Sequence, residues 1–174
     1  AQLIFTAHSI PISMAEQSPY VRQLQEACRL VADRLGRKQW RLVYQSRSGP
    51  PQQPWLEPDI CDVLNELGQA GDVRDVILVP IGFLSDHIEV LFDLDTEANQ
   101  VCQSAGIELV RAGTVGAHPR FVQMIRELIE ERLGSSDVQP LAIGDLGPAP
   151  DVCPADCCPA PRRRPARPVV PEAS

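Results

Sequence analysis

The chain has 174 residues, of which 44% are hydrophobic and 22% are charged, and its formal net charge is −7. This length and apolar content allow one ordinary globular domain with a real core, which excludes wholesale disorder. The negative charge argues against nucleic-acid binding, and the longest nearly apolar stretch, residues 76–84, is far shorter than the roughly 20 residues of a transmembrane segment.

Short apolar runs rich in β-branched residues alternate with segments of helical periodicity. We expect strands at residues 3–7, 41–45, 76–81 and 108–111, and helices at residues 19–35, 58–67, 86–105 and 119–133. The third strand is nearly all apolar, which is typical of a parallel strand buried on both faces. The last helix is expected to bury one side, which carries Phe121, Met124, Ile125, Leu128 and Ile129.

This order of elements predicts an α/β fold, a four-stranded parallel sheet flanked by helices in three layers. Residues 1–134 would form this domain, and residues 135–174 a flexible tail rich in Gly, Pro and Arg. Four Arg after residue 158 against the single Glu172 give that end a charge of +3, which leaves −10 for residues 1–158. Because the chain opens on a strand, we expect it to be a piece of a longer protein.

Ligands bind at the carboxyl ends of the strands in such sheets. His8 follows the first expected strand directly, and the helix after the third carries Glu89, Asp93 and Glu97 at a spacing of four. These carboxylates would form one ridge, either a solvated face or a row of oxygen ligands for a divalent cation. A lone His is often structural, but at this edge His8 and Glu89 would make a proton-handling pair.

The loop after the second expected strand is rich in polar donors and ends in Trp55. Trp55 could anchor the loop or offer a flat surface to a planar ligand, and Arg47 could bind a carboxylate. His118 stands before a Pro at a helix start, where we read it as structural. None of these signals alone names a substrate.

The six cysteines divide into two groups. One group is scattered singly through periodic segments, which favours small buried residues in a reducing cytosol over a disulfide framework. The other clusters in the expected tail. The two groups are Cys28, Cys61 and Cys102, and Cys153, Cys157 and Cys158.

Three long motifs together resemble the ferrochelatase family. They are TAHSIP at residues 6–11, YQSRSGP at 44–50 with PWL at 54–56, and GFLSDHIEVLFDLD at 82–95. The resemblance runs from about residue 1 to residue 133, with the motifs in the family's order and spacing. The motif around His87 is nearly diagnostic by itself.

Ferrochelatases insert Fe²⁺ into a porphyrin during haem biosynthesis. The resemblance implies a lyase-type metal chelatase with two similar four-stranded domains and the porphyrin in the cleft between them, this chain being the carboxyl-terminal domain. Its partners would be the missing amino-terminal domain, in the same or a separate chain, and protoporphyrin IX or coproporphyrin III. Its location would be the cytoplasm or the membrane periphery.

The resemblance also implies roles for individual residues. His8 and Glu89 would be the facing catalytic pair, one holding the metal and the other accepting pyrrole protons. Asp93 and Glu97 would extend this metal site as a path for metal entry or proton exit, because an acidic ridge attracts a cation. The porphyrin side would be lined by Ser46, Trp55 and His87.

Some members of the family bind a [2Fe–2S] cluster through three closely spaced cysteines near the carboxyl end and a fourth in the amino-terminal half. Cys153, Cys157 and Cys158 would then be cluster ligands, and the alternative is a redox-inert tail. Two other functions stay open: a metal or tetrapyrrole carrier without turnover, and a cobalt or sirohydrochlorin-type chelatase. The long motif around Glu89 favours the iron enzyme.

Overall fold

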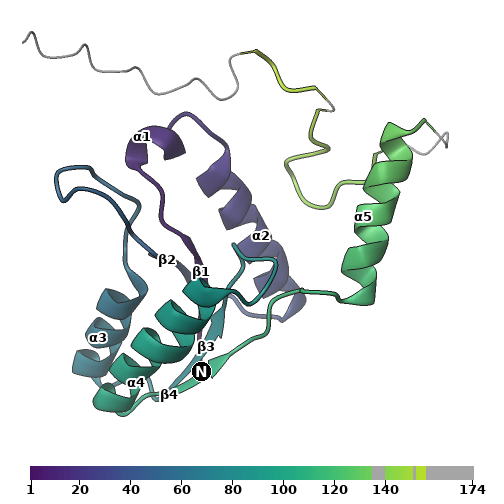
Figure 1. Cartoon of the computed structure of the whole chain (residues 1–174). Coiled ribbons are helices and arrows are strands. Elements are labelled where there is room, and N and C mark those ends of the chain that lie inside the picture. The colour runs from purple at the N-terminus through teal and green to yellow at the C-terminus, as the bar shows by residue number, and fades with distance from the viewer. Residues whose placement is uncertain (135–139, 151, 156–174) are drawn as a thin grey trace, which may run out of the picture.

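The computed structural model describes residues 1–134, 140–150 and 152–155. Within them, one parallel sheet has the strand order β2-β1-β3-β4 (Figure 1). The expected strands are confirmed to within two residues, and so is the predicted α/β fold. The strands are β1 (Gln2–His8), β2 (Trp40–Gln45), β3 (Asp75–Val79) and β4 (Glu108–Arg111).

Helices cover both faces of the sheet because alternate side chains of each strand point to opposite sides. From β1, Phe5 packs on one face with α2 (Tyr20–Arg34), while Ile4 packs on the other with α3 (Ile60–Ala70) and α4 (Asn99–Ala105). A short helix that the sequence did not predict, α1 (Ile12–Ala15), follows β1. In the described residues we find no helix that is long and apolar enough to cross a membrane.

The helix expected at residues 86–105 starts later and changes form along its length. Helical structure begins at Ile88, becomes a π-helix, η1 (Val90–Ala98), and continues as α4. The backbone of the preceding loop forms hydrogen bonds to other parts of the chain. The Gly82 amide donates to the Thr6 carbonyl at 3.1 Å, and the Gly116 amide donates to the Leu84 carbonyl at 2.8 Å. These hydrogen bonds hold the loop at the edge of the sheet, and the helix therefore begins at Ile88, two residues later than expected. Single π-helical turns are rare and often mark functional sites.

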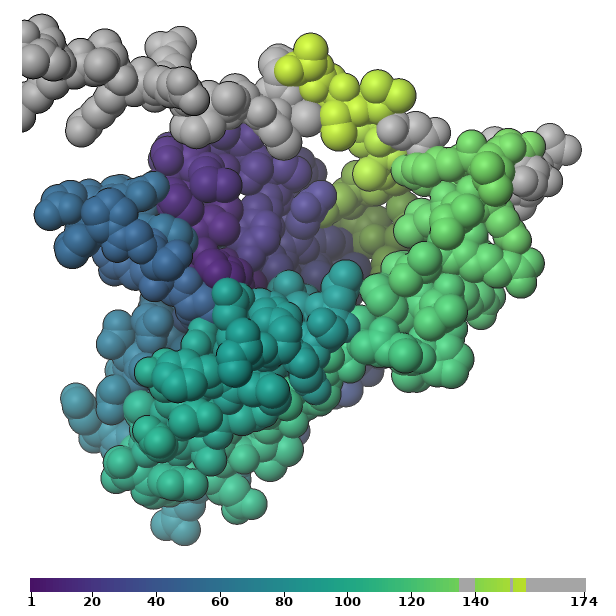
Figure 2. All heavy atoms as spheres, viewed as in Figure 1, coloured from purple at the N-terminus to yellow at the C-terminus, as the bar shows by residue number. Residues whose placement is uncertain are grey.

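The prediction that the last helix buries its apolar side is wrong. α5 (Pro119–Arg132) begins where expected, with the His118 side chain accepting a hydrogen bond from the Arg120 amide as its N-cap. None of its residues is buried within the described part of the chain, and Phe121 is only half-buried. The linker after β4 leads α5 away from the sheet, so that it projects from one side of the molecule (Figure 2). Its exposed apolar stripe contains Met124, Ile125, Leu128 and Ile129.

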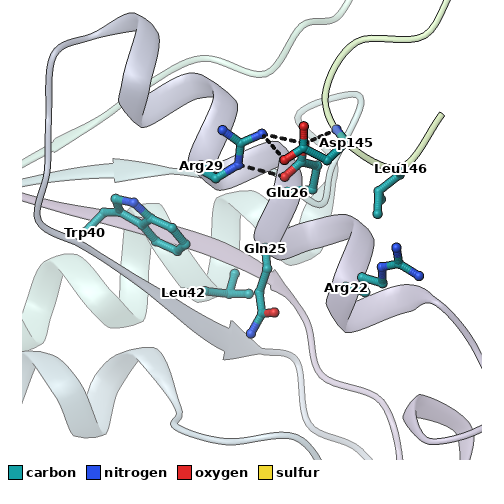
Figure 3. Close-up of a pocket in the computed structure, with 8 residues that line it drawn as sticks. All are labelled: Arg22, Gln25, Glu26, Arg29, Trp40, Leu42, Asp145 and Leu146. Atoms are coloured by element: carbon teal, nitrogen blue, oxygen red, sulfur yellow. Dashed lines mark hydrogen bonds and ion pairs between the residues drawn. The ribbon is translucent and has the colours of Figure 1, made fainter.

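Residues 140–150 contact α2 through a small ion-pair network (Figure 3). Arg29 Nη2 lies 2.7 Å from Glu26 Oε1 and 3.3 Å from Asp145 Oδ2, and the Asp145 amide donates to Glu26 Oε1 at 2.7 Å. This contact borders an open hollow of about 600 Å³ beside Trp40. Trp40 begins β2, so the hollow lies toward the amino edge of the sheet, opposite the edge that carries His8. The division into a domain and a flexible tail stays a prediction.

Replacing Glu26 by Gln is expected to release Asp145 from α2. Hydrogen bonding to Arg29, and then to the Asp145 amide, lowers the pKa of Glu26 from 4.5 to about 2. A lowered pKa means that the ionised contact is intact above pH 4.5 and is lost as the pH falls toward about 2. Amide hydrogen exchange at Asp145 should therefore rise several-fold in Glu26→Gln at neutral pH. Unchanged exchange in this variant, with Glu16→Gln as the control, would contradict the assignment.

Candidate active site

The structure brings together His8 and Glu89, which the sequence placed after two different strands. His8 ends β1, Glu89 immediately precedes η1, and His8 Nε2 lies 3.8 Å from Glu89 Oε2. The two side chains are 33% and 46% exposed, so both can be reached from outside. This His8–Glu89 pair is the candidate centre of the site.

Hydrogen bonds fix the orientation of the His8 ring. Its Nδ1 lies 2.5 Å from the Ser9 carbonyl, and the Tyr20 hydroxyl donates to the His8 carbonyl at 2.8 Å. Because a carbonyl can only accept, Nδ1 carries a proton, and in the neutral ring Nε2 presents its lone pair toward Glu89. Two electron-pair donors therefore face one another, and a proton or a metal cation shared between them makes that arrangement favourable.

Glu89 is held beside His8 by the loop that follows β3. This loop crosses the end of β1 at Gly82, where a Cβ would lie 2.7 Å from Ala7 Cβ and 2.8 Å from Ala7 Cα. Only glycine allows so close a crossing. Beyond the loop, Gln45 Nε2 approaches the Glu89 carbonyl at 3.5 Å, and the Glu89 amide donates to His87 Nδ1 at 3.3 Å.

The predicted acidic ridge runs from Glu89 along η1 to Asp93 and Glu97. Asp93 Oδ2 accepts a hydrogen bond from Ser46 Oγ and one from Gln45 Nε2 at 3.4 Å. Ser46 reaches it from a left-handed backbone conformation, φ 59°, which costs a non-glycine residue about 1–3 kcal/mol. Asp93 is thus oriented by two donors, whereas Glu97 is exposed.

Trp55 and His87 occupy different surroundings. Trp55 pairs with Pro11 across an isolated bridge and lies against Gly49, where a Cβ would come within 3.2 Å of its ring. Its indole Nε1 is buried and has no hydrogen-bond partner among the described residues. The His87 ring packs at a tilt against Phe83, with ring centroids 5.1 Å apart. Trp55 therefore joins the loops that follow β1 and β2.

Sequence reasoning missed three residues that shape this site: Tyr20, Gln45 and Arg111. Tyr20 and Gln45 contact His8 and Asp93 as described above, and Arg111 ends β4 in ion pairs with Asp86 and Asp95. Gln45 and Arg111 carried a signal, because each is a polar residue at the carboxyl end of a strand. Nothing in the sequence tied the Tyr20 hydroxyl to His8.

Where the structure describes the cysteines, the predicted burial of the scattered group is confirmed for Cys28 and Cys102 and is only partial for Cys61. Cys28 and Cys102 are buried, and burial raises the pKa values of their thiols to about 12 and about 11. Cys61 is half-buried, and desolvation followed by the Asp59 charge raises its pKa to about 12. Cys153 is exposed. Cys157 and Cys158 lie outside the described residues. Across the described ranges, no group of three or more His, Cys, Asp or Glu is arranged to hold a metal ion.

Comparison with known proteins finds a matching family and relatives with high sequence identity. The ferrochelatase family model matches residues 1–133. A ferrochelatase of Rhodopirellula baltica is 56% identical over 164 residues, covering 94% of this chain and 46% of that protein. A coproporphyrin III ferrochelatase of Streptomyces coelicolor is 47% identical and covers 95% of this chain and 49% of that protein. The chain therefore spans about half the length of these curated relatives.

A solved structure gives a likeness in fold. It is described as a cobalamin (vitamin B12) biosynthesis CbiX protein of Marinobacter aquaeolei, with a TM-score of 0.52 at 18% identity. The alignment covers 78% of this chain and 98% of that one. At this identity the likeness concerns the architecture alone, an α/β fold. The sequence matches settle the membership: this chain belongs to the ferrochelatase family.

Proposed function

We propose that the protein containing this chain is a metal chelatase, a ferrochelatase that inserts Fe²⁺ into a porphyrin in haem biosynthesis. The observation that carries the proposal is the His8–Glu89 pair, in which an imidazole nitrogen faces a carboxylate at the start of the predicted acidic ridge. Family membership supports the same reaction.

Insertion requires the metal to shed its water and the pyrrole nitrogens to lose their protons. One member of the His8–Glu89 pair holds Fe²⁺ and the other accepts the protons, and both assignments use the same geometry. Asp93, oriented by Ser46 and Gln45, and Glu97 then provide carboxylates along which a cation arrives or protons leave. The porphyrin side of the site is lined by Ser46, Trp55 and His87.

Coproporphyrin III and protoporphyrin IX are the two candidate substrates. Several of the curated relatives are named coproporphyrin III ferrochelatases, which supports coproporphyrin III, while the R. baltica relative is named only ferrochelatase. Coproporphyrin III bears more carboxylates than protoporphyrin IX. A ratio of kcat/KM for the two porphyrins decides between them.

The proposed partner is an amino-terminal domain, in the same or a separate chain. Two observations support it: the chain spans about half the length of its relatives, and the apolar stripe of α5 is exposed. Exposed apolar patches of this kind mark interaction surfaces. We propose a location in the cytoplasm or at the membrane periphery, which membership in the family supports.

We also propose that the tail binds a [2Fe–2S] cluster through Cys153, Cys157 and Cys158. The exposure of Cys153 supports this, while the burial of Cys28 and Cys102 makes them unsuitable as the fourth ligand, which we assign to the partner domain. Iron and sulfide analysis of the complete protein, purified without oxygen, tests the proposal. A colourless, iron-free protein would count against it.

The proposed activity is tested by mixing the complete protein with Fe²⁺ or Zn²⁺ and a free-base porphyrin and following the absorbance. A ferrochelatase gives many turnovers per protein. A carrier binds the porphyrin and leaves it without metal, and a cobalt or sirohydrochlorin-type chelatase leaves the porphyrin unchanged while metalating its own substrate. No insertion with the amino-terminal half supplied would contradict the proposal.

A further inference from the structure

Arg111 is a largely buried cation that the proposed mechanism does not use. It is the last residue of β4, at the same edge of the sheet as His8, and only 15% of its side chain is exposed. Arginine is rarely buried unless it is paired.

The partners of Arg111 lie on either side of Glu89 in the sequence. Arg111 Nε and Nη2 donate to Asp95 Oδ1 and Oδ2 at 2.5 and 2.9 Å. Its Nη1 donates at 3.1 Å both to Asp86 Oδ1 and to the Ala112 carbonyl. Asp86 lies in the loop before η1, and Asp95 lies within η1. One guanidinium thus joins the loop, the π-helix and the end of β4.

Arginine is suited to this set of bonds, and lysine is not. The planar guanidinium has five donors in a fixed fork that matches a carboxylate with two parallel bonds, whereas a lysine ammonium is a single point of charge. Hydrogen bonding to Asp95 raises the pKa of Arg111 above its ordinary value, so the charge is permanent. Removing it leaves two carboxylates without their cation.

We propose that Arg111 is a positioning residue for metal insertion, because it holds the segment from Asp86 to Asp95 against the sheet and so keeps Glu89 facing His8. The inference rests on the proposed function. His8 is fixed by β1 itself, whereas Glu89 depends on a loop and on an uncommon π-helix. The Arg111 guanidinium contacts the loop through Asp86 and the π-helix through Asp95, and so it determines the distance between His8 and Glu89.

The test measures metal insertion by the complete protein with Arg111→Ala. We expect kcat to fall about 10- to 100-fold, the range seen when supporting groups or alignment are lost, with little change in the KM for porphyrin. Guanidinium ions at concentrations far below denaturing ones should restore part of the activity of Arg111→Ala. The Arg111→Lys variant should be about as slow as Arg111→Ala, because lysine lacks the planar fork of donors. Arg41→Ala, which breaks the exposed pair with Glu66 at 3.3 Å, is the matched control and should retain full activity.

The variants at Arg111 and Asp95 test the positioning role, and Glu89→Gln tests the proposed function. A folded Arg111→Ala variant with the normal kcat, or one whose loss guanidinium does not relieve, overturns the positioning role. If Arg111→Ala does not fold, Asp95→Asn is tested instead, because it removes the carboxylate that accepts two hydrogen bonds from Arg111 and keeps the shape of the side chain. A normal kcat in Asp95→Asn also overturns the positioning role. The proposed function fails separately, if Glu89→Gln inserts metal as fast as the unmodified protein.

Discussion

Replacing Glu89 by Gln is expected to slow metal insertion by about 100-fold or more, and replacing His8 by Ala should do the same. General acid–base groups contribute about 10²- to 10⁴-fold to a rate, and these two side chains face each other at 3.8 Å. Because they act as a unit, the double variant should be scarcely slower than the worse single variant. Both side chains are at least one-third exposed, so folding should be little affected.

The measurement is the initial rate of insertion by the complete protein, together with thermal unfolding of each variant. Glu108→Gln is the control, because Glu108 is an exposed residue at the start of β4, on the opposite edge of the sheet. It should leave the rate unchanged. A variant at His8 or Glu89 that retains the full rate would remove that residue from the mechanism.

Gly82→Ala is the second substitution for which we expect a large effect. The added methyl would lie 2.7 Å from Ala7 Cβ and 2.8 Å from its Cα, so backbone must move. Overpacking of this kind costs about 1–3 kcal/mol of stability. The movement also shifts the loop that leads to Glu89 away from the end of β1, and a misplacement of about 1 Å can cost about 100-fold in rate.

Gly68→Ala separates the two effects of that substitution. Its methyl would lie 2.5 Å from Ala105 Cβ, where α3 packs on α4, and should lower the free energy of unfolding by a similar amount. It does not touch the loop, so folded Gly68→Ala should insert metal at the normal rate. A Gly82→Ala protein that matches Gly68→Ala in both stability and rate would contradict the role given to this crossing.

The sheet and its order of elements could be predicted from the sequence, because each strand is a compact β-branched run. The late start of the helix around Glu89 could not, since the bonds that delay it come from Thr6 and Gly116, distant in sequence. The exposure of α5 could not be predicted either. Its periodicity indicates that one side is apolar, and says nothing of what that side packs against.

For the site, the topology predicted the meeting of His8 and Glu89, because the carboxyl ends of adjacent parallel strands share one edge. The details that give the pair its chemistry depend on side-chain geometry instead. The order of residue types does not specify the orientation of a side chain or the backbone conformation of one residue. Two examples are the hydrogen bond from His8 Nδ1 to the Ser9 carbonyl and the left-handed backbone of Ser46. The partners of Arg111 likewise become evident only once β4 and η1 are side by side.

The central claim, that the metal is handled between His8 and Glu89, is tested most directly by anomalous diffraction from crystals of the protein soaked in Zn²⁺. Zinc binds imidazole nitrogen and carboxylate oxygen at about 2.0–2.2 Å. We predict a zinc peak at that distance from His8 Nε2, from a Glu89 carboxylate oxygen, or from both, and its loss in the double variant. Zinc bound elsewhere in the protein, with no peak at either side chain, would contradict the account.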